Sequence, residues 1–315
     1  MRPLISYYGG KQRMSSKIVS LLPKHTVYVE PFCGGAAVFF AKPWPPVTNK
    51  DHYREVLNDL DQRVVNLYQV IRTPGLREQF VERMQLTPYS RIEHRRSVKE
   101  FSTGTLRPAQ EPNQDLYEGL DERVAKAVAY YVNIQCSFAN KLNGGWGTNV
   151  INCNSGAIWM NKIARLPEYL GRMAGVYVEC DDALKVIERW DSPQTLFYCD
   201  PPYPNTTQEY HNNTSRGVFT LDDWHALCQK LDNCQGSFVL SGYDQPTPKH
   251  WERFDFKARS TSRGNSRASG TLDRTQASVR TNTERTECVW RVDRSANARK
   301  EVQDIWDRWS KASDV

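Results

Sequence analysis

An aspartate, two prolines and a tyrosine follow one of the strand-like runs of the chain. TLFYC at 195–199 leads directly into Asp200, Pro201, Pro202 and Tyr203. Adjacent prolines lack amide donors and fix the backbone, so this loop is rigid. A carboxylate and a rigid carbonyl together can accept both hydrogens of a planar amine such as adenine N6, and an aromatic ring can stack on its base. The alternative is a proline-kinked loop without a ligand.

The chemistry that this loop suits is methylation of an exocyclic amine. The nitrogen lone pair is delocalised into the ring, so the amine is a poor nucleophile. Acceptors on both hydrogens, Asp200 and the carbonyl of Pro201, would direct that lone pair toward a methyl donor. A base in a duplex must be flipped out to reach such a pocket.

Small residues follow an earlier strand-like run, at Gly34, Gly35, Ala36 and Ala37. Small side chains let the backbone approach a ligand closely, although a plain tight turn is an equally good interpretation. An acid that ends the next strand, Asp59, is spaced as in nucleotide-binding α/β folds, where it accepts ribose hydroxyls.

Asp59 or Asp61 could instead cap the following helix, and Asp61 fits that role well, which leaves Asp59 for a ligand. The sequence contains no phosphate-binding P-loop motif. A ligand with a ribose but without a phosphate cradle fits S-adenosylmethionine better than ATP or NAD.

The elements that must position these residues alternate between strand-like and helix-like patterns. Continuous apolar strands separated by helices predict an α/β fold with a mostly parallel, Rossmann-like sheet. Ligands of such sheets bind beyond the carboxyl ends of the strands, where the three stretches above lie. The predicted strands are 26–30, 55–58, 176–179, 195–199, 237–241 and 287–292, and the predicted helices lie near 14–22, 61–72, 182–190 and 220–232.

The region 73–155 contains no convincing strand, and its long helix, at about 116–139, leads into the Gly-rich NKLNGGWGTN. We therefore predict a helical insertion at 73–155 within an α/β domain formed by 1–72 and 156–294.

The end of the chain, 295–315, places Val302, Ile305, Trp306 and Trp309 at helical spacing. This spacing predicts a C-terminal amphipathic helix, and docking on the chain's own surface is favoured over a partner interface.

Composition sets broad limits. The chain has 315 residues, of which 39% are hydrophobic and 25% charged, which is typical of a globular protein. No apolar run approaches a membrane span and no secretory segment opens the chain, so we expect a cytoplasmic location. Eight scattered cysteines without a CxxC pair predict free thiols and no metal site. Nothing in the sequence indicates an oligomeric state.

Positive charge gathers at 259–285, which holds six arginines, ten serines or threonines and no aromatic residue. We predict that Arg259, Arg263 and Arg267 contact a phosphate backbone, while a loop that contacts nothing is the alternative. Tyr210 could stack near a flipped base or pack locally. Lys141, in the Gly-rich stretch, is a further candidate for a nucleic-acid contact.

Four motifs in order resemble the Dam-type DNA adenine-N6 methyltransferases: SYYGGKQRM, VEPFCGGAAV, LNDLDQRVVNLY and YCDPPY. The similarity runs from about residue 5 to residue 292. It implies a site-specific enzyme with S-adenosylmethionine as cofactor and double-stranded DNA as partner, and target recognition in the helical insertion. Such enzymes occur in restriction–modification systems, but one chain indicates no restriction partner.

The resemblance also implies roles for individual residues. Asp59 would bind the ribose, and Asp200, within the catalytic loop 200–203, would lie beside the reactive centre. Asp182 would lie near the cofactor adenine, although a helix cap is at least as good an interpretation. Other residues would line the cofactor pocket: Tyr7, Lys11, Phe32 and Gly34.

Two other functions are alternatives for a sequence with these motifs. An RNA adenine-N6 methyltransferase would need the same loop, since contacts to the 2′-hydroxyl come from other surfaces. A non-catalytic nucleic-acid-binding module would have little need for Asp59, the small-residue turn and the intact 200–203 loop together.

Overall fold

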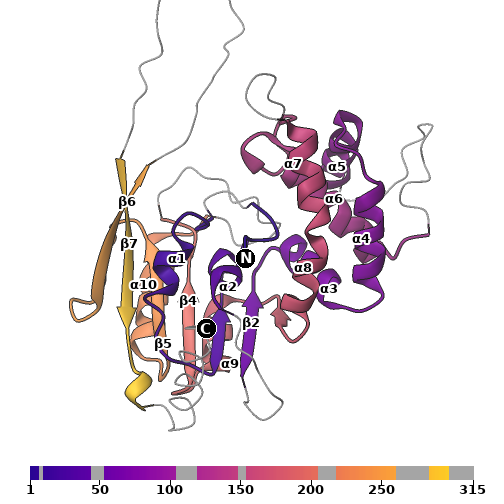
Figure 1. Cartoon of the computed structure of the whole chain (residues 1–315). Helices are drawn as coiled ribbons and strands as arrows, with labels where there is room; N and C mark the ends of the chain where they lie inside the picture. The colour runs from indigo at the N-terminus through magenta and orange to yellow at the C-terminus, as the bar shows by residue number, and fades with distance from the viewer. Residues whose placement is uncertain are drawn as a thin grey trace, which may run out of the picture.

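The computed structural model describes residues 1–6, 10–43, 53–103, 119–147, 154–204, 218–259 and 284–297. Its centre is a seven-stranded sheet with the order β3-β2-β1-β4-β5-β7-β6 (Figure 1). The strands are β1 (Val27–Glu30), β2 (Arg54–Asn58), β3 (Tyr177–Glu179), β4 (Thr195–Cys199), β5 (Ser237–Gly242), β6 (Glu252–Arg259) and β7 (Glu284–Val292).

The first five strands of the sheet are parallel, and β7 runs antiparallel to both β5 and β6. The predicted α/β class with a mostly parallel, Rossmann-like sheet is therefore confirmed. The sequence analysis missed β6, a strand at the edge of the sheet in which charged residues alternate with apolar ones. Edge strands carry such charges because one side of the strand has no neighbour to pair with.

Alternating side chains divide the apolar core into two layers. Leu196 and Tyr198 of β4 face one layer, while Phe197 and Cys199 face the other. The period of two follows from the pleat of a strand. Because helices cover both faces, β1, β4 and β5 are buried along their full length and read as unbroken apolar runs.

Different helices cover the two faces of the sheet. The layer of Leu196 is completed by α1 (Ser15–Val19), α2 (Ala37–Ala41) and α3 (Gln62–Arg72). The layer of Phe197 is completed by α9 (Ala183–Trp190) and α10 (Leu221–Asp232). Side chains cap the start of α3, α9 and α10, and at α10 Thr220 and Asp223 form a reciprocal capping box.

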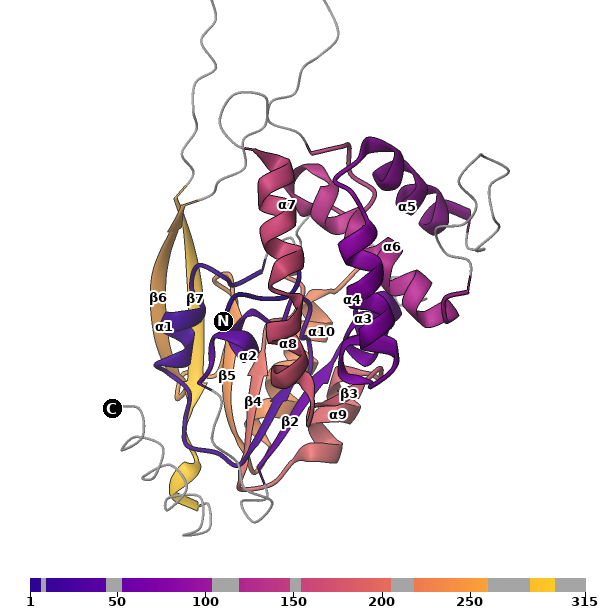
Figure 2. The ribbon, with the colours of Figure 1, turned by 45° about the vertical axis from the view of Figure 1, so that its right-hand side comes forward.

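A lobe of helices lies beside the sheet (Figure 2). The long predicted helix runs from Glu122 to Cys136 and is shorter than expected at both ends, because Asp121 caps its start and a 3₁₀ turn (η2, Phe138–Asn140) follows it. The lobe shares its apolar core with α3, and its helices are α4 (Leu76–Leu86), α5 (Arg91–Thr103), α6 (Glu122–Cys136), α7 (Ser155–Ala164) and α8 (Leu166–Met173). Helices thus continue past residue 155, while the division into domains stays a prediction.

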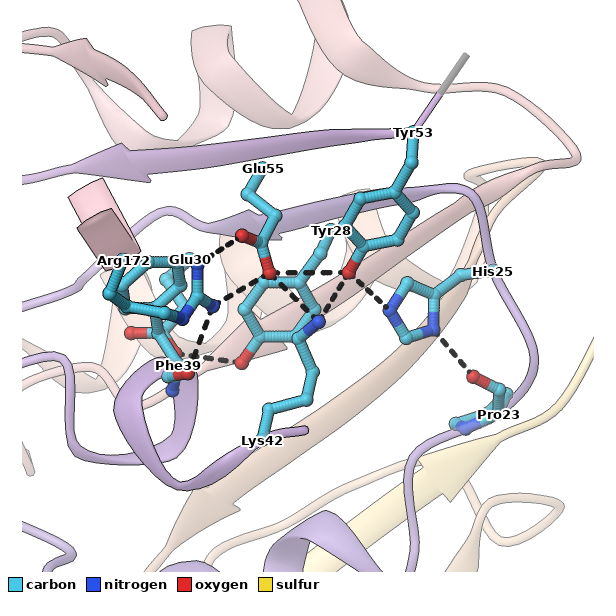
Figure 3. Close-up of polar contacts among 9 residues, drawn as sticks. All are labelled: Pro23, His25, Tyr28, Glu30, Phe39, Lys42, Tyr53, Glu55 and Arg172. Carbon is cyan, nitrogen blue, oxygen red and sulfur yellow. Dashed lines mark hydrogen bonds and ion pairs between the residues drawn. The ribbon is translucent and has the colours of Figure 1, made fainter. Parts of the chain in front are cut away.

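A buried polar network fastens α8 and α2 to the sheet (Figure 3). Glu55 of β2 lies 2.8 Å from Lys42 Nζ and 2.8 Å from an Arg172 nitrogen of α8. Arg172 also donates to the carbonyl of Phe39 in α2, at 3.1 Å. Burial alone would raise the pKa of Glu55, but Lys42 and Arg172 outweigh it and lower the pKa to about 2.

His25 ends this network as a neutral base. Burial, reinforced by Lys42, lowers the pKa of His25 to about 3. Its Nδ1 lies 2.7 Å from the carbonyl of Pro23, which can only accept, so Nδ1 carries the proton.

Among the described residues, no helix is long and apolar enough to cross a membrane. The predicted C-terminal amphipathic helix falls almost wholly on 298–315, outside the described residues. Six of the cysteines are buried free thiols: Cys33, Cys136, Cys199, Cys228, Cys234 and Cys288.

Candidate active site

Three stretches singled out in the sequence meet at one edge of the sheet. β1 lies between β2 and β4, and all three run parallel. Their carboxyl ends therefore bring together the turn from Phe32 to Ala36, Asp59 and the Asp200 loop. This is the edge at which open α/β sheets bind ligands.

The turn after β1 has a backbone that favours small residues. Gly34 and Ala36 have φ angles of 45° and 50°, in the left-handed region. The Gly34 amide donates to Asp59 Oδ2 at 2.8 Å, and the Gly34 carbonyl accepts from the Tyr68 hydroxyl at 2.9 Å. Glycine at this position thus permits a closely held turn between β1 and α2.

Asp59 is held by backbone amides rather than by a cation. Its Oδ1 accepts from the amide of Asp61 at 2.9 Å, and Oδ2 accepts from Gly34. Burial, reinforced by the Asp61 carboxylate, raises the pKa of Asp59 to about 6. Asp61 itself caps α3 by accepting from the Arg63 amide, as predicted.

This acid fits the ribose of S-adenosylmethionine. The two carboxylate oxygens have four lone pairs, and the amides of Gly34, Leu60 and Asp61 do not occupy all of them. Hydrogen bonds from further donors, such as the two ribose hydroxyls, would stabilise the negative charge of Asp59, which burial disfavours.

Asn58, which the sequence analysis missed, ties three strand ends together. Its Nδ2 donates to the carbonyls of Pro31 (2.9 Å) and Asp181 (3.0 Å), and its Oδ1 accepts from the Asp181 amide. The available signal was a polar residue at the end of an apolar strand. Asp182, the residue after Asp181, caps α9 by accepting from the Leu184 amide at 2.9 Å. Its contact with the cofactor adenine stays a prediction.

Lys11 brings the N-terminal segment into contact with the 200–203 loop. Its Nζ lies 2.6 Å from Asp200 Oδ1 and also donates to the Tyr203 hydroxyl. Burial alone would lower the pKa of Lys11, but Asp200 and Glu287 outweigh it and raise the pKa. The lysine is therefore a buried, charged partner of Asp200, although the sequence predicted only a pocket residue.

Glu287 of β7 is a second site residue that sequence reasoning missed. Its Oε1 lies 3.3 Å from Lys11 Nζ and accepts from the Tyr203 hydroxyl at 2.5 Å. A glutamate at the start of a strand is usually solvent-exposed, so no sequence pattern indicated this contact.

Tyr203 lies inside this cluster rather than at an open face. It is 8% exposed, and its ring centroid is 4.3 Å from that of Tyr243. Pro201 is buried, and the contact of its carbonyl with the amine stays a prediction. Phe32 packs edge-to-face against Phe219, with centroids 6.3 Å apart.

Lys141 is exposed beside a turn with a fixed shape. The Asn133 side chain holds that turn by accepting from the Asn143 amide at 2.8 Å. Four predicted site residues lie outside the described residues: Tyr7, Tyr210, Arg263 and Arg267. Arg259 ends β6, and its side chain is likewise not described.

The end of β6 nevertheless has a defined place. β7 is antiparallel to β5, so its first residues lie at the carboxyl edge of the parallel strands. Arg259 pairs with Glu284 at the start of β7, which places the two ends of the arginine-rich segment at the active-site edge. No group of three or more potential metal ligands occurs among the described residues.

The fold and the site together define a Rossmann-like methyltransferase with an Asp-Pro-Pro-Tyr loop beside its cofactor turn. The family model of the D12 class N6 adenine-specific DNA methyltransferases matches residues 7–263, so the chain belongs to that family. This confirms the resemblance on which the adenine-N6 chemistry rested. The family depends on S-adenosylmethionine, and its substrate is DNA.

Individual relatives of the chain show low sequence identity to it. The chain is similar to the DNA N-6-adenine-methyltransferase of Escherichia phage P1 (25% identical over 254 residues), covering 76% of this chain and 29% of that protein. It is similar to the retron Ec67 DNA adenine methylase of Escherichia coli (24%), covering 74% and 73%. It is also similar to the type II methyltransferase M1.LlaDCHI of Lactococcus lactis subsp. cremoris (26%), covering 76% and 80%. The match thus spans less than a third of the phage relative.

Proposed function

We propose that this protein methylates N6 of an adenine that has been flipped out of double-stranded DNA, at a short specific site. The observation that carries the proposal is the position of Asp200, paired with Lys11 at the edge where Asp59 holds the cofactor turn. When bound, S-adenosylmethionine supplies an electrophilic methyl group. A DNA substrate agrees with the cytoplasmic location expected from the sequence.

The cofactor pocket is formed by the turn after β1 and the acids around it. Asp59 accepts the ribose hydroxyls with the lone pairs that the Gly34 and Asp61 amides leave open. Tyr7, Phe32 and Asp182 line the remainder of the pocket, as the family resemblance implies.

The target amine is held by Asp200 and the carbonyl of Pro201. Lys11 holds Asp200 in place through an ion pair of 2.6 Å between Nζ and Oδ1. An ionised acceptor holds one amine hydrogen and stabilises the positive charge that methylation puts on N6. Because Asp200 would accept an amine hydrogen, it would also be placed to take the proton that N6 then loses.

Target recognition is assigned to the helical insertion, 73–155, and to the arginine-rich segment between β6 and β7. Lys141 supports this assignment because it is exposed beside a turn with a fixed backbone. Arg259, Arg263 and Arg267 would contact phosphates from the active-site edge, and Tyr210 would stack near the flipped base.

The test is single-molecule sequencing of DNA from a host without adenine methylation, with and without the protein, and with Asp200→Ala as the inactive control. N6-methyladenine at one short motif supports the proposal. Methylation at many unrelated adenines would keep the chemistry and contradict site specificity. Unmodified DNA, despite a thermal shift with S-adenosylmethionine, would overturn the DNA substrate.

A further inference from the structure

Glu287 is a buried carboxylate at the active-site edge to which the proposed function assigns no role. It is 6% exposed and lies near the start of β7. Val289, two residues further on, belongs to the same apolar core as Ile5 and Ile18 of the N-terminal segment. Side chains two apart share a face of a strand, so Glu287 also faces the segment that carries Lys11.

The hydrogen bonds around Glu287 have a defined direction. An ammonium can only donate and a carboxylate can only accept, so the Tyr203 hydroxyl accepts from Lys11 and donates to Glu287. The 2.5 Å contact to Glu287 is far shorter than the 3.4 Å contact from the same hydroxyl to Asp200. Glu287 therefore orients the Tyr203 hydroxyl away from Asp200.

This arrangement leaves one oxygen of Asp200 for the substrate. The contacts that the described residues make with this carboxylate reach Oδ1, from Lys11 and from Tyr203. The Asp200 side chain is 20% exposed, whereas that of Lys11 is 6% exposed. Among the described residues, Oδ2 accepts no hydrogen bond, so it is the oxygen available to the substrate.

Glu287 also sets the charge of the cluster. One ammonium faces two carboxylates, so Lys11, Asp200 and Glu287 together carry one net negative charge when all three are ionised. Fixed negative charge in a partly desolvated site stabilises positive charge that develops during a reaction. Without Glu287, the ammonium would neutralise Asp200 alone.

We propose that Glu287 is a positioning residue for methyl transfer. It holds Lys11 and the Tyr203 hydroxyl on the Oδ1 side of Asp200 and keeps the cluster net negative beside N6. The proposal rests on the role proposed above for Asp200.

The pH dependence follows from the groups that face Glu287. These are Lys11 from the N-terminal segment, Tyr198 from β4, and Asp200 and Tyr203 from the loop after β4. Its partner on β6 is the uncharged Phe256. Burial raises the pKa of Glu287, with Lys11 opposing and Asp200 adding to the rise. Protonation as the pH falls removes the net negative charge, so the methyl-transfer rate should fall on the acid side.

The experiment compares single-turnover methylation by the wild type and by Glu287→Gln from pH 5 to 9. Glutamine keeps an acceptor for Tyr203 but removes the charge. We expect the rate at neutral pH to fall at least about tenfold, with unchanged affinity for DNA and for S-adenosylmethionine. We also expect the acid limb of the rate profile to move to lower pH. Glu252→Gln is the matched control, because Glu252 pairs with Arg291 on the surface of the same two strands.

A Glu287→Gln variant with the wild-type rate, or with a slower rate but an unmoved acid limb, overturns the proposal. If that variant does not fold, Glu287→Asp decides: a slower rate with the limb retained is expected, and a wild-type rate contradicts the role. Asp200→Ala separates the two hypotheses. If it stays active, the role of Asp200 fails; if it is inactive while Glu287→Gln behaves as wild type, only the role of Glu287 fails.

Discussion

Asp59 Oδ2 accepts a hydrogen bond from the Gly34 amide at 2.8 Å, which joins the carboxyl end of β2 to the turn after β1. The bond fixes the acid and the small-residue turn as one unit, although 25 residues separate them. Cofactor binding should therefore depend on the ionisation of Asp59 as well as on its presence.

The first prediction concerns the pH dependence of cofactor affinity. The pKa of Asp59 is about 6, so its carboxylate becomes protonated as the pH falls below that value. If only the carboxylate binds the ribose, the Kd for S-adenosylmethionine rises about tenfold per pH unit below about 6. Calorimetric titrations between pH 5 and 8 measure this slope.

Two variants control that measurement. Asp59→Asn should bind weakly with a flat pH profile. Asp61→Asn keeps a good helix cap but removes a charge that raises the pKa of Asp59, so the midpoint should move to lower pH. An Asp59→Asn variant that retains the wild-type slope would return Asp59 to a structural role.

A second prediction separates chemistry from binding at Asp200. Asp200→Ala removes the acceptor that holds the amine, and we expect kcat to fall about 100-fold or more. The fold and the cofactor site should persist, which a thermal shift checks: S-adenosylmethionine at 100 times its Kd should still stabilise by about 2.7 kcal/mol. Substantial turnover by this variant would exclude the role given to the carboxylate.

Glu30, at the end of β1, gives a third prediction, on stability. Burial raises its pKa to about 8, while its Oε1 accepts from Tyr28 and from the Phe39 amide (Figure 3). Its pKa in the unfolded chain is close to 4.5. The neutral form thus stabilises the fold fully below about pH 4.5, and this contribution is lost as the pH rises through about 8.

Glu30→Gln mimics the neutral form at every pH. Relative to the wild type, its free energy of unfolding should rise between about pH 4.5 and 8 by on the order of a few kcal/mol. Urea unfolding at several pH values measures the difference. Glu188→Gln, which alters an exposed pair with Lys230, should follow the wild type. Parallel curves for Glu30→Gln and the wild type would refute the prediction.

A fourth prediction concerns the arginine-rich segment. Deletion of 262–280 removes Arg263, Arg267 and two further arginines. DNA affinity should fall, and the slope of log K against log salt should shrink by about 0.9 for each lost phosphate contact. Fluorescence anisotropy at several salt concentrations measures both. An unchanged affinity and slope would show that the segment does not contact DNA.

Much of the fold was predictable from local patterns. The helices α3, α9 and α10 lie within one residue of the predicted ranges, because apolar periodicity and capping side chains act locally. β6 was missed because its alternating charges are typical of exposed chain as well as of an edge strand. The helix predicted at about 116–139 was too long at both ends, because Asp121 caps its start and η2 continues its pattern after Cys136.

Residue types and their near neighbours were enough to indicate the chemistry, because an acid, a rigid proline carbonyl and a small-residue turn are recognisable in the sequence wherever they lie in the fold. The charges around Asp200 depend on the folded arrangement of the chain. Lys11 contacts Asp200 across 189 residues of sequence. Glu287 contacts Lys11 and Tyr203 from β7, an antiparallel strand whose register sets which face each side chain occupies. Such contacts follow from sheet topology, and no local pattern encodes them.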